Sequence, residues 1–561
     1  MKISSLLSDG LVLQRNEENK IWGTEAIGKV TVKVTKDNKE IVLKEAVSDD
    51  TGSFEALIPP LEAGGPIEIE IWDEKDKKTI KDVMVGDVFL LAGQSNMEIP
   101  VRRTLDLTRE YSSKINNFQI RHFEVPKEFD FHGPVSDIYG GTWKNANQEN
   151  VYDFSAIGYF FAEMVNRDES VPVGLIQTAV GGIQIEALIP EEKLSKIIPK
   201  LKDNAIARGE SKEKTCRCGK NHYCKFCIEE RIEKDKDDEW VKNTLKTEEE
   251  NTAEALKKMD ETDEGLKENF KDKTTLFFDG SKPQYINVPG RWENLSENAF
   301  LEDFRGTIWT LKNFEVPDEM VGKEARLKLG TIIDADETYL NGTLIGRTEY
   351  RYPPRRYDVP AGLLKKNNTL VVRIKAIDRA GGFVEEMPYF LEHGDIKIPL
   401  DRSWEFRIGS NCNPEYKKKA SVAPDGTFFM FRPYGMYNKM IYPLRRMKLK
   451  GMLFYQGESN TMFYNEYDSL MKLLASSVRE CFDDPGLKMA FVELPFYGQE
   501  DDERGTDNWD NLRLAQERAA KEIPDSVLVD IYDLGFKYEL HPQNKMDVAK
   551  RVYDAFKKLA Y

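Results

Sequence analysis

The chain has 561 residues, which is too long for one hydrophobic core and predicts three or four domains. Its 81 Lys and Arg residues against 97 Asp and Glu residues give a formal net charge of −16, which argues against nucleic acid or an anionic membrane surface as a partner. No apolar run reaches the roughly 18 residues of a membrane span, and the first residues lack the basic and apolar regions of a secretory signal. We therefore expect a protein of the cytoplasm.

The chain begins with short alternating segments, such as residues 29–34 and 67–71, which are divided by Gly and Pro. This pattern is typical of a small β domain, which we assign to residues 1–82. From Val83 onward, strand-like runs alternate with helical ones, which predicts an α/β fold with a mainly parallel sheet covered by helices. The candidate strands of this sheet are residues 88–92, 173–179, 452–455, 489–494 and 527–531.

The first of these strands ends in the polar turn Gly93-Gln-Ser-Asn-Met97, which is centred on Ser95. A serine at the C-terminal tip of a buried strand is held rigidly, and it is exposed at the crevice where open α/β sheets bind ligands. An ordinary surface turn would use the same residue types. Ser95 is therefore a candidate nucleophile only if the rest of the chain supplies a base, an acid and N–H donors.

Two insertions interrupt the α/β pattern. Residues 201–274 contain a cluster of four cysteines and then a charged run that favours solvated helices. Residues 275–400 alternate like strands again, and Asn341-Gly342 between two of them is a strong hairpin signal. The α/β domain is therefore predicted to be split into residues 83–200 and 401–561, because a domain whose termini lie close together tolerates insertion.

The clustered cysteines predict a metal site. Cys216, Cys218, Cys224 and Cys227 can supply four thiolates to a tetrahedral zinc ion, and His222 could replace one of them. Disulfides are the alternative, which a reducing compartment disfavours. We expect a closed structural zinc site, which leaves no open position for catalysis.

A base for Ser95 must come from one of only five histidines, which are His122, His132, His222, His393 and His541. The first four lie in an irregular stretch, in the Cys cluster or in the inserted β region. His541 follows the last predicted strand and precedes a terminal amphipathic helix, so it is expected on a loop at a helix entrance. It is the candidate base by elimination, with a structural histidine as the alternative.

An imidazole that accepts a serine proton needs an acceptor for its other nitrogen. Glu539 lies two residues before His541, and Glu458 lies in a second polar turn, Tyr455-Gln-Gly-Glu-Ser-Asn460, at the end of another predicted strand. Either carboxylate could orient the base.

The oxyanion of an acyl transfer needs positioned N–H donors. Three candidates follow the ends of predicted strands: the backbone N–H of Ser95, the glycine pair Gly181-Gly182, and the side-chain amide of Gln456. Each of them also fits an ordinary turn, so it is their combination that favours a catalytic site.

These motifs, in this order, resemble those of SGNH-type hydrolases, and more narrowly those of the sialic acid-specific 9-O-acetylesterase family and related carbohydrate acetylesterases. The motifs are Gly93-Gln-Ser-Asn-Met97, Gly174-Leu-Ile-Gln-Thr-Ala-Val-Gly-Gly182, Tyr455-Gln-Gly-Glu-Ser-Asn460 and His541-Pro542. Residues 7–15 and 437–443 are also similar to that family.

The resemblance implies an SGNH, flavodoxin-like fold, in which a parallel sheet forms the middle of three layers. It implies Ser95 as nucleophile and His541 as base without a catalytic cofactor, and an oxyanion site of Ser95, a glycine of the Gly181-Gly182 pair and Gln456. We also expect three side chains of the two polar turns to contact the substrate, namely Gln94, Asn96 and Asn460.

The resemblance leaves the acid open. The SGNH pattern has an Asp three residues before the histidine, but this chain has Tyr538 there. Relatives among the sialate esterases often have an acid two residues before the histidine, which matches Glu539. In related acetylesterases the Glu of the Gln-Gly-Glu motif has that role, which matches Glu458.

The inserted β region has a resemblance of its own. Residues 306–309, 334–342 and 357–362 are similar to the sugar-binding jelly-roll domain of glycoside hydrolase family 2. The resemblance implies a jelly-roll-like, galactose-binding-like β-sandwich in residues 275–400. Such a module could help to shape a carbohydrate site, or it could serve packing alone.

We therefore expect a serine esterase that removes acetyl groups from an O-acetylated sugar through an acetyl-enzyme on Ser95. The alternatives are an acetylxylan or oligosaccharide acetylesterase of the same superfamily, a carbohydrate-binding protein without turnover, and a metalloenzyme that uses the Cys cluster. The sequence identifies neither the sugar nor the oligomeric state.

Overall fold

The computed structural model describes residues 1–215, 223–292, 301, 304–377, 381–385, 387–412, 427–498, 506–537 and 539–561. These residues form two compact units, residues 1–238 with 428–561 and residues 239–427. Within the described ranges, no helix has both the length and the apolar character that crossing a bilayer requires.

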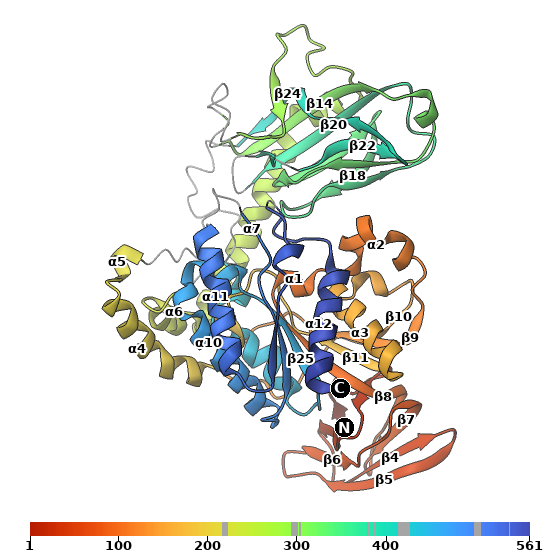
Figure 1. Ribbon diagram of the computed structural model, residues 1–561, viewed down its shortest axis with the longest axis vertical. Coiled ribbons are helices and arrows are strands. Elements are labelled where there is room, and N and C mark those ends of the chain that lie inside the picture. Colours follow the sequence, from red (N-terminus) through yellow and green to blue (C-terminus); the bar gives the residue numbers. More distant parts are fainter. Residues whose placement is uncertain are drawn as a thin grey trace. The chain divides into compact units, whose positions relative to one another are not determined.

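The first unit is built on a sheet with the strand order β10-β9-β11-β8-β25-β26-β27 (Figure 1). The strands are Trp143–Ala146 (β10), Asn117–Glu124 (β9), Val173–Gln177 (β11), Lys77–Gly93 (β8), Gly451–Tyr455 (β25), Lys488–Val492 (β26) and Ser526–Val529 (β27). Neighbouring strands run parallel except β10, which is antiparallel to β9. A mainly parallel sheet was expected from the alternating strand and helix patterns.

The strand order differs from the flavodoxin-like order that we expected. In that order, 2-1-3-4-5, the first strand pairs with the second. Here β9, the second parallel strand, lies outside β11, and β8 pairs with β11 and β25. Later strands are added on both sides of β8, so the order in which strands follow one another in the sheet reverses at β8. The crevice at the carboxyl ends of β8 and β25 is therefore the place where such a sheet binds ligands.

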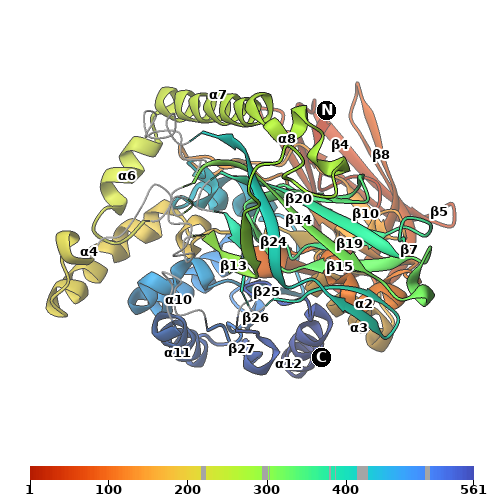
Figure 2. The same ribbon diagram turned by 90° about the horizontal axis from the view of Figure 1, so that it is seen from above.

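Helices cover both faces of this sheet. On one face α3 and α12 pack side by side, and Phe89 of β8 makes edge-to-face contacts with Phe161 of α3 and Phe556 of α12 at centroid distances of 4.9 and 5.5 Å. α10 and α11 pack together on the other side (Figures 1 and 2). The helices of the unit are α1 (Ser95–Glu98), α2 (Leu105–Ser112), α3 (Ala156–Glu169), α4 (Glu191–Ala207), α5 (Lys212–Thr215), α6 (Ile228–Asp235), α10 (Tyr464–Cys481), α11 (Thr506–Glu522) and α12 (Lys545–Ala560).

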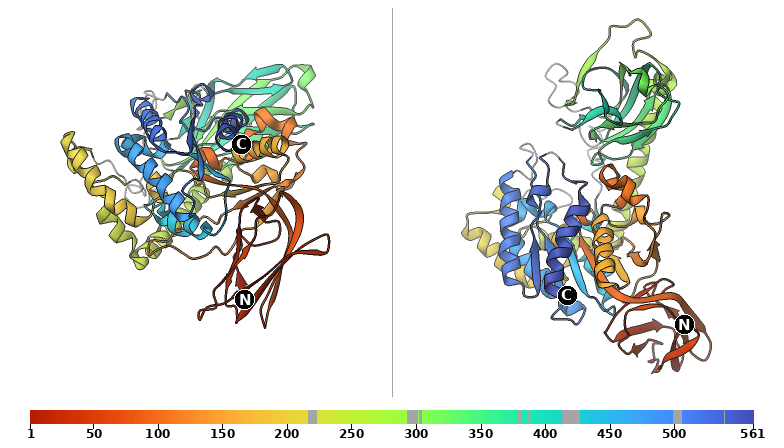
Figure 3. Two further views of the ribbon diagram at one scale, coloured as in Figure 1. Left: turned by 60° about the horizontal axis from the view of Figure 1, so that its bottom comes forward. Right: turned by 45° about the vertical axis from the view of Figure 1, so that its right-hand side comes forward.

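The N-terminal β strands are joined to the central sheet by the long strand β8 (Figure 3). Its first part pairs with β7, and its last seven residues pair with β11 and β25. The boundary predicted at residues 82 and 83 therefore falls inside one strand. The other N-terminal strands are β1 (Lys2–Ile3), β2 (Val12–Gln14), β3 (Asn19–Thr24), β4 (Lys29–Lys36), β5 (Lys39–Val47), β6 (Phe54–Ile58) and β7 (Gly64–Trp72).

The second unit contains an antiparallel sheet of order β12-β24-β14-β20-β17-β18 and another of order β19-β15-β22-β23, which share one apolar core. A small sheet, β13-β21-β16, lies beside them. The strands are β12 (Tyr285–Val288), β13 (Gly290–Arg291), β14 (Gly306–Glu315), β15 (Ala325–Leu329), β16 (Ile332–Ile333), β17 (Ala335–Leu340), β18 (Thr343–Thr348), β19 (Arg356–Val359), β20 (Asn367–Ala376), β21 (Gly382–Phe383), β22 (Tyr389–His393), β23 (Ile396–Pro399) and β24 (Arg402–Asn411).

The predicted Asn341-Gly342 turn does join two antiparallel strands, β17 and β18. Both turn residues have positive φ, 49° and 83°, as the tight hairpin requires. The predicted end of the β region at residue 400 is wrong by one strand, because β24 pairs with β12 and β14 of the sandwich.

The charged insertion predicted at residues 201–274 is not one body. The end of α4 and all of α6 belong to the first unit, whereas α7 (Asp238–Thr262) begins at the division and α8 (Glu264–Lys267) belongs to the second unit. The physical reason is Asp263, which caps α8 and accepts hydrogen bonds from Trp309 of β14 and Arg373 of β20.

Candidate active site

Gly93 lets the ends of β8 and β25 approach closely. Its φ is +126°, and a Cβ atom at this position would lie 2.1 Å from the carbonyl oxygen of Tyr455. Gln94 N donates to the same oxygen at 2.9 Å, which holds the two turns together after the strands end. Ser95 begins α1 directly beyond this contact, so a rigid pair of strands fixes its position.

The structure brings Ser95 and His541 together although 446 residues separate them in the chain. Ser95 Oγ lies 2.8 Å from His541 Nε2, which is within the range for proton transfer between a nucleophile and its base. His541 lies in the loop that precedes α12, whose first residue is Lys545. The loop position expected from the sequence is the observed one.

Asn96 links three segments behind this pair. Its Nδ2 donates to Glu458 Oε1 at 2.6 Å and to the carbonyl oxygen of Leu540 at 3.1 Å, and its Oδ1 accepts from Lys545 Nζ at 2.6 Å. The side chain is almost fully buried. The Asn96 amide therefore holds the loop that contains His541, and the substrate contact expected of it stays a prediction.

The side-chain amide of Gln456 is bonded within the protein. It is completely buried, and its Nε2 donates to Gln94 Oε1 at 3.1 Å and to Asn460 Oδ1 at 2.8 Å. A third acceptor, the carbonyl oxygen of Ile183, lies at 3.0 Å. Gln456 therefore supports the two turns from behind, and its role as an oxyanion donor stays a prediction.

Gln94 and Asn460 are buried in the same network. Gln94 Oε1 also lies 3.2 Å from Ser459 N, and Asn460 Nδ2 donates to Glu186 Oε2 at 2.9 Å. The contact with substrate expected of these two side chains stays a prediction. Gln94 connects the Ser95 turn to the Glu458 turn, and Asn460 connects the Glu458 turn to Glu186.

Gly181 is the member of the glycine pair that lies near the nucleophile. A Cβ atom on Gly181 would be 3.4 Å from Ser95 Cβ, and the Gly181 N–H donates to Glu98 Oε2 at 2.5 Å. Glu98 Oε1 is paired with Lys127 at 2.5 Å. The Gly181 N–H thus faces a carboxylate oxygen next to Ser95, and Glu98 is a site residue that sequence reasoning missed.

Gly182 has a different task from Gly181. Its φ is +85°, and a Cβ atom would lie 2.4 Å from the ring of Phe431, so only glycine fits. Its carbonyl oxygen accepts from Ser459 Oγ at 2.8 Å. Gly182 shapes the turn, and Gly181 is left as the candidate oxyanion donor of the pair.

Lys545 is the second residue that the sequence analysis missed. Burial lowers the pKa of its ammonium to about 7, although the charges of Glu458 and Glu539 act in the opposite direction. A signal was present, because Lys545 stands three residues before Val548 on the stripe that α12 buries. A lysine at the start of an apolar stripe indicates a charge that the protein keeps inside.

The two candidate acids both lie within electrostatic reach of Lys545. Glu458 is 2 % exposed and accepts the hydrogen bond from Asn96. Glu539 belongs to the same loop as His541. The choice between them stays a prediction to be tested.

The predicted zinc site lies partly outside the described residues, because Cys216, Cys218 and His222 are not among them. Cys224 and Cys227 lie in the turn before α6, with their sulfur atoms 3.8 Å apart. Within the described ranges, no three metal-binding side chains come together.

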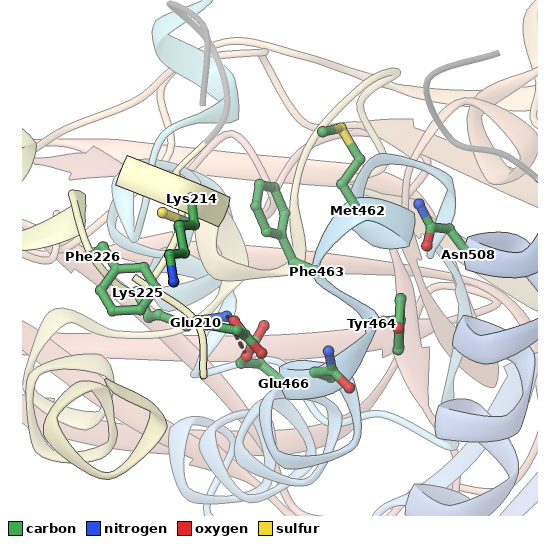
Figure 4. A pocket seen from close by; sticks show the side chains of 11 residues that line it. Glu210, Lys214, Lys225, Phe226, Met462, Phe463, Tyr464, Glu466 and Asn508 are labelled. Carbon is green, nitrogen blue, oxygen red and sulfur yellow. Dashed lines mark hydrogen bonds and ion pairs between the residues drawn. The ribbon is translucent and has the colours of Figure 1, made fainter. Parts of the chain in front are cut away.

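A cavity of about 590 Å³ lies next to Cys224 (Figure 4). Phe463 and Glu466, which follow the Glu458 turn, form part of its lining, and Phe226 lines it too. Lys225 is paired here with Glu466 at 2.7 Å and with Glu210 at 2.6 Å. The charges at this cavity are therefore largely compensated within the protein.

Two segments of the chain match a known protein family. Residues 85–213 and 422–556 match the family model of a carbohydrate esterase described as sialic acid-specific acetylesterase. The sialate O-acetylesterase of Homo sapiens is 26% identical over 200 residues, which cover 33% of this chain and 38% of that protein. The enzyme of Mus musculus is 24% identical over 242 residues, which cover 40% and 45%. The chain thus spans less than half the length of these curated relatives.

Two further proteins are similar to this chain. The crystal structure of a carbohydrate acetylesterase from Xanthomonas citri matches with a TM-score of 0.54 and 19% identity, covering 100% of this chain and 75% of that one. A β-glucuronidase of Formosa agariphila is 26% identical over 91 residues, which cover 16% of this chain and 9% of that protein.

The match to the family model begins inside β8 and ends inside α12, so it includes Ser95, Gly181, Glu458 and His541. Residues 85–213 and 422–556 are therefore similar to the sialic acid-specific acetylesterase family of carbohydrate esterases.

Proposed function

We propose that this protein is a serine esterase that hydrolyses O-acetyl esters of carbohydrates through an acetyl-enzyme on Ser95. The observation that carries the proposal is the 2.8 Å distance between Ser95 Oγ and His541 Nε2. The matching family and the sialate O-acetylesterase relatives favour an acetylated sugar, such as an O-acetyl sialic acid, as the substrate class.

Ser95 Oγ attacks the carbonyl carbon of the acetyl ester while His541 Nε2 takes the serine proton. The negative charge of the tetrahedral intermediate goes to the former carbonyl oxygen. The N–H groups of Ser95 and Gly181 are the donors proposed for this oxygen. Since the Gly181 N–H is bonded to Glu98, the substrate oxygen has to take the place of that carboxylate oxygen.

The intermediate collapses when His541 returns the proton to the sugar oxygen, so the sugar alcohol leaves and the acetyl group stays on Ser95. In the second half of the reaction, His541 removes a proton from water, which attacks the acetyl carbon. The bond to Ser95 Oγ breaks, this oxygen takes the proton back, and acetate leaves.

The test is acetate release from O-acetyl sialic acid, acetylxylan oligomers and simple acetylated sugars. We expect Ser95→Ala and His541→Ala each to lower kcat at least about 1,000-fold, because either change removes the activated nucleophile. Ser113→Ala, which loses only an exposed hydrogen bond to Glu110, and His393→Ala in the second unit serve as matched controls and should keep wild-type rates. Wild-type turnover by purified Ser95→Ala would contradict the proposal.

The same panel of substrates separates the alternatives. Preference for acetylxylan oligomers would favour an acetylxylan or oligosaccharide acetylesterase, and binding of sugars without acetate release would favour a non-catalytic protein. A metalloenzyme would lose turnover in a chelator while its fold persists.

The acid behind His541 is proposed to be Glu458 or Glu539. Both are within electrostatic reach of Lys545, and each can be neutralised with little change in shape. A comparison of Glu458→Gln with Glu539→Gln in one acetate-release assay assigns the role to the variant with the larger loss of kcat. Equal, small losses of kcat in the two variants would exclude both carboxylates from the role of the acid.

We further propose that the second unit is a galactose-binding-like module and that the four cysteines hold a structural zinc ion. The two antiparallel sheets around one apolar core support the first of these, and the 3.8 Å between the sulfur atoms of Cys224 and Cys227 is compatible with two thiolates on one ion. Metal analysis of the purified protein tests the second, since about one zinc per chain is expected. Action in the cytoplasm stays a prediction of the sequence.

A further inference from the structure

Lys545 is a buried charged side chain that the proposed reaction does not use. It is 1 % exposed and stands at the first position of α12, four residues after His541. Its Nζ donates to Asn96 Oδ1 at 2.6 Å and lies 5.6 Å from the centre of the Tyr455 ring. A lysine in such a place needs a reason, because burial of an ammonium group is costly unless its charge has partners.

One consequence of this lysine is the orientation of the Asn96 amide. An ammonium group donates hydrogen bonds and accepts none, so the carbonyl end of the amide must face Lys545. The NH₂ end then points to the opposite side, where Glu458 Oε1 and the carbonyl oxygen of Leu540 accept its hydrogens. Lys545 thus adds a third hydrogen bond that favours the same orientation of the amide.

The same amide ties the His541 loop at both ends. The carbonyl oxygen of Leu540 precedes His541 directly, and Lys545 follows it at the start of α12. Asn96 follows Ser95 directly in α1. The Ser95 turn and the His541 loop are thus clamped through one side chain, which fixes the distance between nucleophile and base.

The second consequence is electrostatic. Glu458 and Glu539 supply two negative charges near Lys545, and Arg103 from η1 (Val101–Thr104) adds a positive charge. Asp106 of α2 reaches the same loop, where its Oδ2 accepts from Gln543 Nε2 at 3.4 Å. Below about pH 7, where Lys545 is mainly protonated, its positive charge disfavours protonation of the His541 imidazole and so keeps His541 available as a base.

We propose that Lys545 is a positioning residue of the esterase, which clamps the His541 loop to the Ser95 turn through Asn96 and holds His541 in its neutral form. The inference rests on the proposed function of Ser95 and His541. It adds a residue that acts on the base through its bond to Asn96 and through its charge, without touching the substrate.

The test is the pH profile of kcat/KM for p-nitrophenyl acetate, measured with the wild type, Lys545→Met and Lys545→Gln. Both variants remove the charge, so we expect the acid limb, where His541 becomes protonated, to move to higher pH by about one unit. Only Lys545→Gln keeps a donor for Asn96 Oδ1. We therefore expect it to retain a higher plateau than Lys545→Met, whose plateau should fall at least about tenfold.

Lys550→Met is the matched control, because Lys550 is exposed on the same helix and pairs with Asp554. Lys550→Met should leave both the acid limb and the plateau of kcat/KM unchanged. An unshifted acid limb in Lys545→Met and Lys545→Gln, with an active wild type, overturns the inference and leaves the proposed function intact. If neither variant folds, Lys545 serves stability and the positioning role is rejected. A wild type without ester hydrolysis would instead contradict the proposed function.

Discussion

At the scale of single residues, the site depends on a position where no side chain fits as well as on the side chains that react. Gly93 has φ +126° and no room for a Cβ atom, since the Tyr455 carbonyl oxygen would lie 2.1 Å away. This glycine allows β8 and β25 to end side by side, which places the Ser95 turn next to the turn that carries Glu458.

We predict that Gly93→Ala lowers the free energy of unfolding by at least about 2 kcal/mol, because the new methyl group overlaps backbone that cannot move without separating the strands. Gly486→Ala is the control, since a Cβ atom there meets only the Asp484 side chain at 3.7 Å. Denaturant unfolding of both variants checks the prediction. Equal stability of the two would show that the contact at Gly93 is relieved easily.

A second prediction at this scale concerns Glu186, which is 6 % exposed and bonded to Asn460. Burial raises its pKa to about 7 from an ordinary value of 4.5. Because the folded-state pKa is the higher one, this carboxyl group contributes stability below pH 4.5, and that contribution is lost as pH rises through about 7.

Glu186→Gln keeps an acceptor for Asn460 and removes the titration. We therefore expect a variant that is as stable as the wild type near pH 5 and more stable near pH 8, by up to about 3 kcal/mol. The exposed Glu149→Gln should show no such pH dependence. Thermal unfolding at the two pH values decides, and a stability difference that does not grow with pH would contradict the buried, protonated state of Glu186.

At the scale of elements, the strands and the loop that carry the chemistry could be predicted. The apolar run before Ser95 and the single histidine between the last strand and the terminal helix are signals along the chain. The roles of Gln456 and Asn96 could not be predicted, because an amide in a turn can face either substrate or protein. Only the position of neighbouring acceptors, such as Glu458 for Asn96, decides which.

The order of the strands was also beyond the sequence. The pattern from Val83 onward indicates parallel strands and helices, but it does not say on which side of β8 each later strand is added. The boundary after the sandwich was misplaced for a related reason, since β24 looks like any other strand until its pairing with β14 is known.

A prediction at this scale concerns Ser155, the N-cap of α3. Its Oγ accepts from Gly158 N at 3.1 Å and donates to the carbonyl oxygen of Met97 at 2.7 Å, so it joins the start of α3 to the end of α1. We expect Ser155→Ala to lower the free energy of unfolding by about 1 to 2 kcal/mol. Ser113→Ala, which loses only an exposed bond to Glu110, should change it by less than about 0.5 kcal/mol. Equal effects would argue against the cap.

At the scale of the whole molecule, every residue proposed for the reaction belongs to the first unit, although the second unit separates Gly181 from Glu458 in the chain. The ends of the second unit lie near each other. Thr427 is bonded to Glu248, which stands ten residues into α7 and so about 15 Å along that helix from Asp238.

We therefore predict that a chain in which a short Gly- and Ser-rich linker replaces residues 239–427 still hydrolyses p-nitrophenyl acetate at a rate within about tenfold of the full chain. Its Ser95→Ala form should be inactive. On acetylated oligosaccharides the shortened chain should show a higher KM if the second unit binds sugar. A folded but inactive shortened chain would show that residues of the second unit take part in the reaction.

The most direct measurement for the central claim is a rapid acid quench of the wild-type protein during turnover of p-nitrophenyl acetate, followed by mass analysis of its peptides. We predict one added acetyl group on the peptide that contains Ser95, and none on this peptide in Ser95→Ala. Turnover with a full burst of p-nitrophenol but acetyl groups only on other residues would contradict Ser95 as the nucleophile.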